Sequence, residues 1–268
     1  MSKTKVYLLD GGSLVVDGFH VFWNRGPGGE VRFPCYSVLI DHQDGLYLYD
    51  TGYDHAHVMR VLPFEKPLQT AEQTVPGALA KVGLKPSDIN YVINSHYHFD
   101  HCGGNKYLTT ACTVCHAAEL EACNCPQPFE RLGYSDYNFA PDLAKVRGVE
   151  LPDEPEIDIY TPKFETVTGD HELAKGLWLF ETPGHTAGHY SMMVELADRR
   201  PMLFSGDACY TAKSLEMMCI SGFHLDPTKS VQSLQRLKDL AEKHDAELFF
   251  SHDPDSFPGY KQAPEYYS

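Results

Sequence analysis

The sequence predicts an α/β fold in one domain that spans residues 1–268. Strand-like segments alternate with single helical segments in both halves of the chain, which is typical of packed layers of helix and sheet. No linker rich in proline, glycine or serine divides the two halves. A chain of 268 residues buries about three quarters of its unfolded surface, so we expect a core that needs no disulfide bonds.

Segments rich in β-branched and aromatic residues predict the strands, and apolar residues at three- and four-residue spacing predict the helices. In the first half we expect strands over residues 5–16, 37–49 and 90–94, and helices over residues 77–82 and 117–123. The turn signal Gln43-Asp44-Gly45 divides the second of these strands into a hairpin, and Gly83 ends the first helix.

In the second half we expect strands over residues 177–181, 189–196, 201–205 and 246–251, and a helix over residues 227–244. The apolar face predicted for that helix contains Val231, Leu234, Leu237, Leu240 and Ala241. Residues 126–147 contain several aromatic residues without a clean period, so no element is predicted there.

The charge balance excludes several classes of partner. The chain has 22 Lys and Arg against 37 Asp and Glu, a net charge of −15 with neutral histidine. It has no basic run, so we expect no nucleic-acid partner. No apolar run approaches the ~18 residues of a membrane span. The first ten residues lack the apolar stretch of a secretion signal, so we expect a cytoplasmic protein with reduced cysteines.

A cluster of potential metal ligands directly follows the short apolar strand at 91–93. His96, His98, Asp100 and His101 lie within six residues, and these nitrogen and oxygen ligands suit Zn²⁺. If the backbone stays extended, His96 and His98 point to the same side, because side chains alternate along a strand. Asp100 and His101 then follow where the chain turns, and they can serve a second ion.

Three more candidate ligands follow later apolar strands, each at a turn of small residues. They are His185, Asp207 and His252. A lone histidine in such a place is more often structural, and we expect that role for His189, four residues after His185. The joint occurrence of all four pieces indicates a metal centre instead.

These residues together resemble the metallo-β-lactamase superfamily. The pattern H-x-H-x-D-H covers residues 96–101. The order typical of that superfamily continues with His185, Asp207 and His252. In addition, Asp50-Thr51-Gly52 resembles its Asp-Thr-Gly element near the metal site. The resemblance covers nearly the whole chain. It implies an αβ/βα sandwich that holds two Zn²⁺ ions per chain at one edge.

The same resemblance implies a division of the ligands between the two ions. One Zn²⁺ would be held by His96, His98 and His185, and the other by Asp100, His101 and His252; Asp207 would bridge them. Two zinc ions about 3.5–4 Å apart polarise a carbonyl and lower the pKa of water to about 7, so hydrolysis is the expected reaction. The pair Asp100-His101, where many β-lactamases have a non-ligand after the aspartate, argues against an antibiotic-degrading role.

Further residues resemble the lactonase branch of the superfamily. Tyr210 stands three residues after the bridging aspartate. The resemblance implies that its phenol hydrogen-bonds the substrate carbonyl oxygen. The expected catalytic residues are therefore Asp100, Asp207 and Tyr210. The alternative for Tyr210 is a packed core tyrosine. Residues 18–25 resemble the apolar loop that overhangs the lactonase pocket. We expect Phe19, Phe22, Trp23 and Phe129 to line the substrate pocket.

Within that branch, residues 8–13, 22–30, 101–106, 126–129 and 132–136 resemble the 4-pyridoxolactonases, which open 4-pyridoxolactone to 4-pyridoxic acid in vitamin B6 degradation. The expected function is therefore zinc-dependent hydrolysis of a small-molecule lactone, most simply 4-pyridoxolactone. The alternatives are an N-acyl-homoserine lactonase, which would need an apolar groove for its acyl chain, and a thioesterase of the glyoxalase II type.

Four cysteines stand close together at 112, 115, 123 and 125. The run Cys112-Thr-Val-Cys115-His116 matches a haem-attachment pattern, but that chemistry requires an exported protein. The spacing of Cys112, Cys115, Cys123 and Cys125 is unusual for a structural zinc site, so we expect reduced, partly buried thiols. An iron-containing redox protein of the same fold would need a flavin domain for which this chain has no room.

Overall fold

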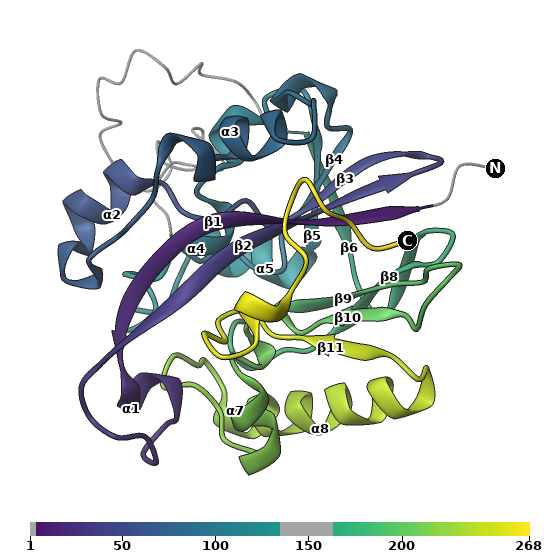
Figure 1. The fold of residues 1–268 in the computed structure, drawn as a ribbon. Helices are drawn as coiled ribbons and strands as arrows, with labels where there is room; N and C mark the ends of the chain where they lie inside the picture. The colour runs from purple at the N-terminus through teal and green to yellow at the C-terminus, as the bar shows by residue number, and fades with distance from the viewer. Residues whose placement is uncertain (1–3, 135–162) are drawn as a thin grey trace.

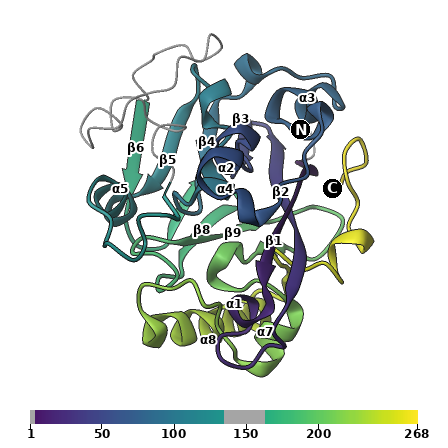
Figure 2. The same ribbon diagram turned by 90° about the vertical axis from the view of Figure 1, so that its left-hand side faces the viewer.

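Two β-sheets packed face to face form the centre of the molecule (Figure 1). The structure is a computed structural model that describes residues 4–134 and 163–268. Most of the segment 126–147, for which the sequence predicts no element, therefore lies outside the described residues. Helices cover the outer face of each sheet, which gives the expected αβ/βα sandwich (Figure 2).

The first sheet has six strands in the order β1-β2-β3-β4-β5-β6. Their bounds are Lys5–Asp17, Glu30–His42, Gly45–Tyr49, Tyr91–Ile93, Cys112–His116 and Lys163–Val167. The second sheet has the order β11-β10-β9-β8-β7. In chain order from β7, its strands are His171–Ala174, Leu177–Glu181, Tyr190–Val194, Met202–Phe204 and Glu247–Phe249.

Apolar side chains from the facing surfaces of the two sheets form the central core. Leu8, Ile40 and Ile93 of the first sheet pack against Met192 and Phe204 of the second, and all five are at most 1% exposed. Burial of this apolar surface on both sides holds the two sheets together.

The helices are short except for the last one. Their bounds are α1 Gly18–Val21, α2 His55–Val61, α3 Val75–Ala80, α4 Phe99–Cys102, α5 Ala117–Asn124, α7 Ala212–Met217 and α8 Pro227–Lys243. Leu79 of α3 packs on the outer face of the first sheet. Leu234 and Leu237 of α8 pack on the outer face of the second. Within the described residues, no helix is long and apolar enough to cross a membrane.

The helix α8 begins where its sequence predicts. Asp226 accepts hydrogen bonds from the backbone N–H groups of Thr228 and Lys229, and Pro227 occupies the first helical position. Leu234, Leu237 and Leu240 of the predicted apolar face are buried, but Val231 is 43% exposed. The helix therefore buries a narrower face than the spacing alone indicates.

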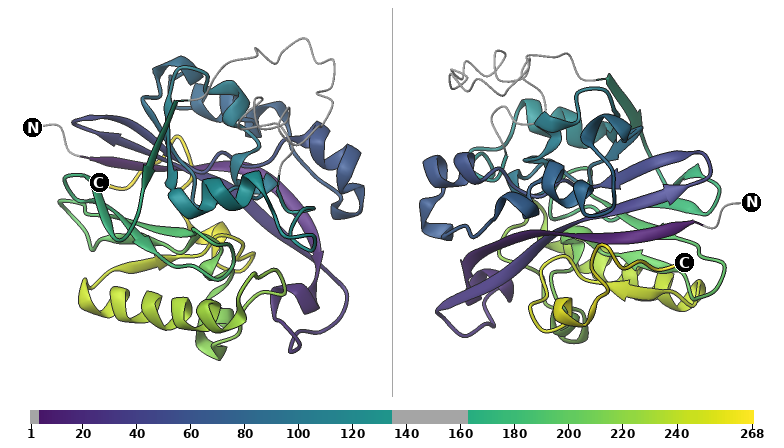
Figure 3. Two further views of the ribbon diagram at one scale, coloured as in Figure 1. Left: turned by 180° about the vertical axis from the view of Figure 1, so that it is seen from behind. Right: turned by 45° about the horizontal axis from the view of Figure 1, so that its top comes forward.

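The outer edge of β1 is covered by the end of the chain. The backbone N–H of Val6 donates to Tyr267, and the N–H of Tyr267 donates back to Val6, both at 2.9 Å. The N–H of Ala263 donates to the carbonyl of Leu8. The C-terminal segment consequently lies along β1, as the two views of Figure 3 show. An edge strand of the sheet is thus partly paired within the chain.

Candidate metal centre

All the predicted ligands lie at the carboxyl ends of strands, at the same edge of the sandwich. The cluster from His96 to His101 follows β4 of the first sheet. His185 follows β8, Asp207 follows β10 and His252 follows β11, which all belong to the second sheet. The metal centre therefore joins the two sheets.

The first group of ligand atoms comes from His96, His98 and His185. Nε2 of His185 lies 3.2 Å from Nε2 of His96 and 2.9 Å from Nδ1 of His98. Oδ2 of Asp207 lies 3.3 Å from Nε2 of His185 and 3.9 Å from Nε2 of His96. Three nitrogens and one oxygen thus converge, which is the donor set of a four-coordinate zinc site.

The second group lies on the other side of Asp207. Oδ1 of Asp207 is 3.1 Å from Nε2 of His101 and 3.0 Å from Nε2 of His252. Oδ2 of Asp100 is 3.6 Å and 3.5 Å from the same two nitrogens. Asp207 therefore directs one oxygen to each group, which is the geometry that a bridging carboxylate requires.

The far ring nitrogens of His185 and His252 are held by hydrogen bonds. Nδ1 of His185 lies 2.6 Å from the carbonyl oxygen of Phe223, and Nδ1 of His252 lies 2.9 Å from that of Pro34. Because a carbonyl only accepts, both Nδ1 atoms carry the proton and leave the Nε2 lone pair directed inward. These contacts orient the rings as metal ligands.

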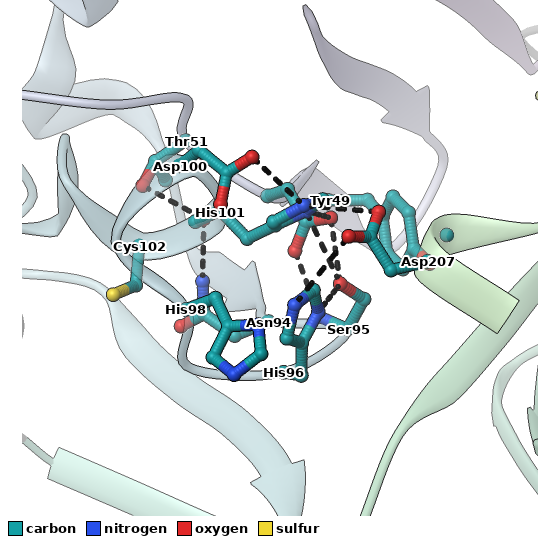
Figure 4. A network of polar contacts seen from close by, with 12 residues as sticks. Tyr49, Thr51, Asn94, Ser95, His96, His98, Asp100, His101, Cys102 and Asp207 are labelled. Atoms are coloured by element: carbon teal, nitrogen blue, oxygen red, sulfur yellow. Dashed lines mark hydrogen bonds and ion pairs between the residues drawn. The ribbon is translucent and has the colours of Figure 1, made fainter. Parts of the chain in front are cut away.

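Asp50 contacts both ends of the segment that contains the histidine cluster, Ser95 and His101. Its carboxylate accepts hydrogen bonds from the backbone N–H of Ser95 at 2.7 Å and from Nδ1 of His101 at 2.8 Å. Thr51 donates to Asn105 and accepts from the N–H of Gly104. Figure 4 shows the resulting network between the Thr51 segment and the loop from Asn94 to His101. The Asp-Thr-Gly element thus fixes the loop that holds four ligands.

His189 supports Asp207 from behind. Its ring is fully buried, and Nε2 accepts a hydrogen bond from the backbone N–H of Asp207 at 2.8 Å. Nδ1 lies 2.9 Å from Oγ1 of Thr182. Neither nitrogen is left to bind a metal, which agrees with the structural role expected for His189.

Glu119 of α5 is a supporting residue that the sequence analysis missed. Its fully buried carboxylate accepts hydrogen bonds from the N–H of Tyr97 at 3.1 Å and from the N–H of Gly188 at 2.9 Å. Tyr97 lies between two ligands and Gly188 lies three residues after His185. One side chain therefore ties together the two loops that supply the first group of ligands. No motif signals this role, because it depends on the packing of α5.

Burial sets the charge state of the first group. It lowers the pKa of His98 and of His185 to about 3 and the pKa of His96 well below its usual range. Neutral imidazole is the form that binds a metal ion. These three rings are therefore ready to act as ligands at neutral pH.

Unpartnered atoms in the second group test whether metal ions fit. Nε2 of His101, Nε2 of His252 and Oδ1 of Asp207 are buried, and within the described residues none has a hydrogen bond of acceptable geometry. Buried polar atoms normally have partners, so this group is built for an occupant. A bridging carboxylate with imidazole and carboxylate ligands on either side suits two zinc ions.

Cys35 of β2 also lies beside the second group, and the sequence analysis did not single it out. Its sulfur and one ligand atom each of Asp100 and His252 lie within 4.8 Å of one another. Of the four cysteines near residue 112, Cys115 and Cys123 are buried, and none belongs to a potential metal-binding group of the described residues. The described residues contain no disulfide bond.

A cavity of about 420 Å³ opens onto the metal centre. Four ligand residues line it: His98, Asp100, His185 and Asp207. Tyr210 also lines it, with its ring centre 6.0 Å from that of His185 and 5.0 Å from that of His252. The Tyr210 side chain is therefore placed between the two groups of ligands at the floor of the cavity.

The expected pocket residues are only partly correct. Phe129 lines the cavity, whereas Phe19, Phe22 and Trp23 do not. The reason is that residues 18–21 form the helix α1, capped by Asp17, instead of an extended apolar loop. Successive side chains on a helix point in different directions, so His20 faces the cavity while Phe19 is 51% exposed.

Other apolar wall residues were not predicted from the sequence. They are Val15, Val16, Phe33, Leu62, Phe64, Phe99, Leu132 and Phe223. Trp23 does not line the cavity, but its ring packs against His224, which does.

Comparisons with known proteins agree with the fold and the site. The profile of the metallo-beta-lactamase superfamily matches residues 31–252. The chain is 30% identical over 275 residues to the N-acyl homoserine lactonase AttM of Rhizobium radiobacter, with all of both chains covered. It is 29% identical to the N-acyl homoserine lactonase AiiA of Bacillus thuringiensis subsp. kurstaki, covering 99% of this chain and all of the relative.

A solved structure of an N-acyl homoserine lactone hydrolase, with the product N-hexanoyl-L-homoserine bound at its catalytic metal centre, matches the whole chain at 28% identity and a TM-score of 0.82. The chain therefore belongs to the metallo-beta-lactamase superfamily, and it is a metal-dependent hydrolase. The relatives favour the N-acyl-homoserine alternative over 4-pyridoxolactone, which they do not support.

Proposed function

We propose that this protein hydrolyses the ring ester of a lactone at a pair of zinc ions. The observation that carries the proposal is the placement of Tyr210 and four ligand residues at the floor of one cavity with apolar walls. The lactonase relatives support the same reaction class. The seven ligand positions and the role of Tyr210 are part of this proposal.

The residues of the chain divide the work of the reaction. Zinc ions, when bound, polarise the lactone carbonyl and supply water of lowered pKa. Burial raises the pKa of Tyr210 well above its usual value, so the phenol stays neutral and donates a hydrogen bond. This donor stabilises the negative charge that develops on the carbonyl oxygen. Asp100, on the cavity floor, is placed to return a proton to the ring oxygen that leaves.

Two substrate classes have separate support. N-acyl homoserine lactones are supported by the names of the relatives and by the apolar cavity walls. A compact aromatic lactone such as 4-pyridoxolactone is supported by a different observation, since two carboxyl groups, Glu65 and Glu130, line the same cavity. A long alkyl chain offers such groups no hydrogen-bond partner.

Zinc quantification coupled to a hydrolysis panel tests the proposal. The panel holds 4-pyridoxolactone, N-hexanoyl homoserine lactone, a glutathione thioester and a β-lactam. We expect two zinc ions per chain and ring opening of at least one lactone. Faster turnover of the thioester or the β-lactam than of either lactone would contradict the proposal.

A further inference from the structure

Of the carboxyl groups that line the cavity and have no part in the proposed reaction, Glu65 and Glu130 stand out, because Asp17 accepts backbone hydrogen bonds and Glu30 pairs with Lys66. Glu65 ends the 3₁₀ turn Pro63–Glu65 that follows α2, and Glu130 lies in the segment next to Phe129. Both residues line the cavity above the metal centre. Acidic side chains are rarely buried without a partner, so their position here calls for an explanation.

Glu65 is the more enclosed of the two. It is only 9% exposed, and the nearby residues Leu62 and Phe64 also line the cavity. Within the described residues, its carboxyl group has no hydrogen bond or ion pair. The neighbouring cation Lys66 is paired with Glu30 instead.

Glu130 shows the same feature at a second point of the cavity. Its Oε1 is buried and has no hydrogen-bond partner among residues 4–134 and 163–268. Two polar groups without partners thus face one apolar cavity. An occupant that covered either group without forming a hydrogen bond would leave it desolvated and unpaired, which is unfavourable.

Burial also changes what these groups can do. It raises the pKa of Glu65 to about 8, with a smaller contribution from the charge of Asp100. Burial likewise raises the pKa of Glu130 to about 7, assisted by the charge of Glu119. A protonated carboxyl group both donates and accepts hydrogen bonds. Such a group is a suitable partner for a ring nitrogen or a phenolic hydroxyl.

We propose that Glu65 is a specificity-determining residue that hydrogen-bonds a heteroatom on the non-reacting part of the substrate. It selects a compact lactone fused to an aromatic ring with nitrogen and hydroxyl groups over a lactone with a plain alkyl chain. This inference rests on the proposed lactonase function. The physical reason is that an alkyl chain leaves the carboxyl group unpaired, and sites built to hydrogen-bond a substrate reject analogues that lack the partner.

The experiment measures kcat/KM of the zinc-loaded protein with 4-pyridoxolactone and with N-hexanoyl homoserine lactone. The variants are Glu65→Leu, Glu65→Met and Glu65→Gln. The control is Glu72→Leu, an exposed carboxyl group seven residues away and outside the cavity. Zinc content and melting temperature are measured on every variant. If Glu65→Leu loses zinc or unfolds, the values of kcat/KM of Glu65→Met with the two lactones replace those of the Leu variant.

We expect the wild type to prefer 4-pyridoxolactone. Glu65→Leu should lower kcat/KM for this substrate by about 10- to 100-fold and leave the value for the acyl lactone within threefold or raise it. Glu65→Gln, which still donates and accepts, should lose less than the Leu variant, and Glu72→Leu should change neither value.

Two outcomes overturn the inference while the lactonase proposal stands. The first is a wild type that prefers the acyl lactone by more than tenfold. The second is a Glu65→Leu variant that loses both activities equally or neither. A wild type that opens no lactone at all instead contradicts the proposed function itself.

Discussion

Asp207 is the residue on which both proposed metal positions depend, because its two oxygens face different groups of histidines. We expect Asp207→Ala to retain at most one zinc ion per chain and little activity, since no other side chain is placed to serve both ions. Inductively coupled plasma mass spectrometry of the purified variant measures this. The control is His189→Gln, whose amide can still accept from the N–H of Asp207 and should keep both ions. Two zinc ions and near-normal turnover in Asp207→Ala would contradict the bridging role.

The Tyr210→Phe variant distinguishes a catalytic hydrogen-bond donor from a tyrosine that only packs in the core. Tyr210→Phe keeps the ring contacts with His185 and His252 and removes only the hydroxyl group. We expect kcat to fall roughly 10- to 100-fold, at the lower end for an oxyanion donor because zinc shares the stabilisation. Zinc content and melting temperature should stay the same. A kcat within twofold of wild type would show that the tyrosine is a core residue.

The cluster of candidate metal ligands could be predicted from the sequence, whereas most residues that shape the cavity could not. His96 and His185 stand in a dense motif whose chemistry is local to a few positions. Glu65, Glu119 and Cys35 are single residues whose importance arises only when distant segments pack together. Burial is what gives them their properties, and burial depends on the whole fold.

Among the elements, strands and long helices are easier to predict than short helices. The strand β8 has its predicted bounds, and α8 differs from its prediction by one residue at its end. The strand β2 begins seven residues before its predicted start, because Glu30 to Tyr36 pair with β1 although Pro34, which has no N–H to donate, interrupts the run. The four-residue helix α1 depends on the Asp17 cap and has too few turns to show a period.

The helix α5 contacts the loops of the candidate metal centre through Glu119. Glu119→Ala leaves the backbone N–H groups of Tyr97 and Gly188 buried without an acceptor. We expect the free energy of unfolding to fall by about 2 kcal/mol or more, and zinc to be lost to a chelator at a lower chelator concentration. Urea unfolding and chelator titration measure the two effects. Glu121→Ala, at an exposed position of the same helix, is the matched control. Unchanged zinc retention in Glu119→Ala would limit its role to packing.

At the scale of the whole molecule, the candidate metal centre draws its proposed ligands from both sheets. Ligands after β4 belong to the first sheet and ligands after β8, β10 and β11 to the second. Metal ions that bind only the folded chain stabilise it by mass action. We therefore expect chelation of zinc to lower the melting temperature by several degrees, and added zinc to restore it, as calorimetry would measure. An unchanged melting temperature after complete metal removal would contradict this cross-link.

The pairing of β1 with the C-terminal segment has a consequence for biosynthesis. The strand β1 leaves the ribosome before every other strand, yet Val6 and Leu8 receive their outer partners from residues 262–267, which are made after β11. During translation this edge therefore stays open to other nascent chains, as unpaired edge strands are. A deletion or fusion that displaces Tyr267 should accordingly reduce the soluble yield of the expressed protein. The molecules that do fold should keep the kcat of the wild type.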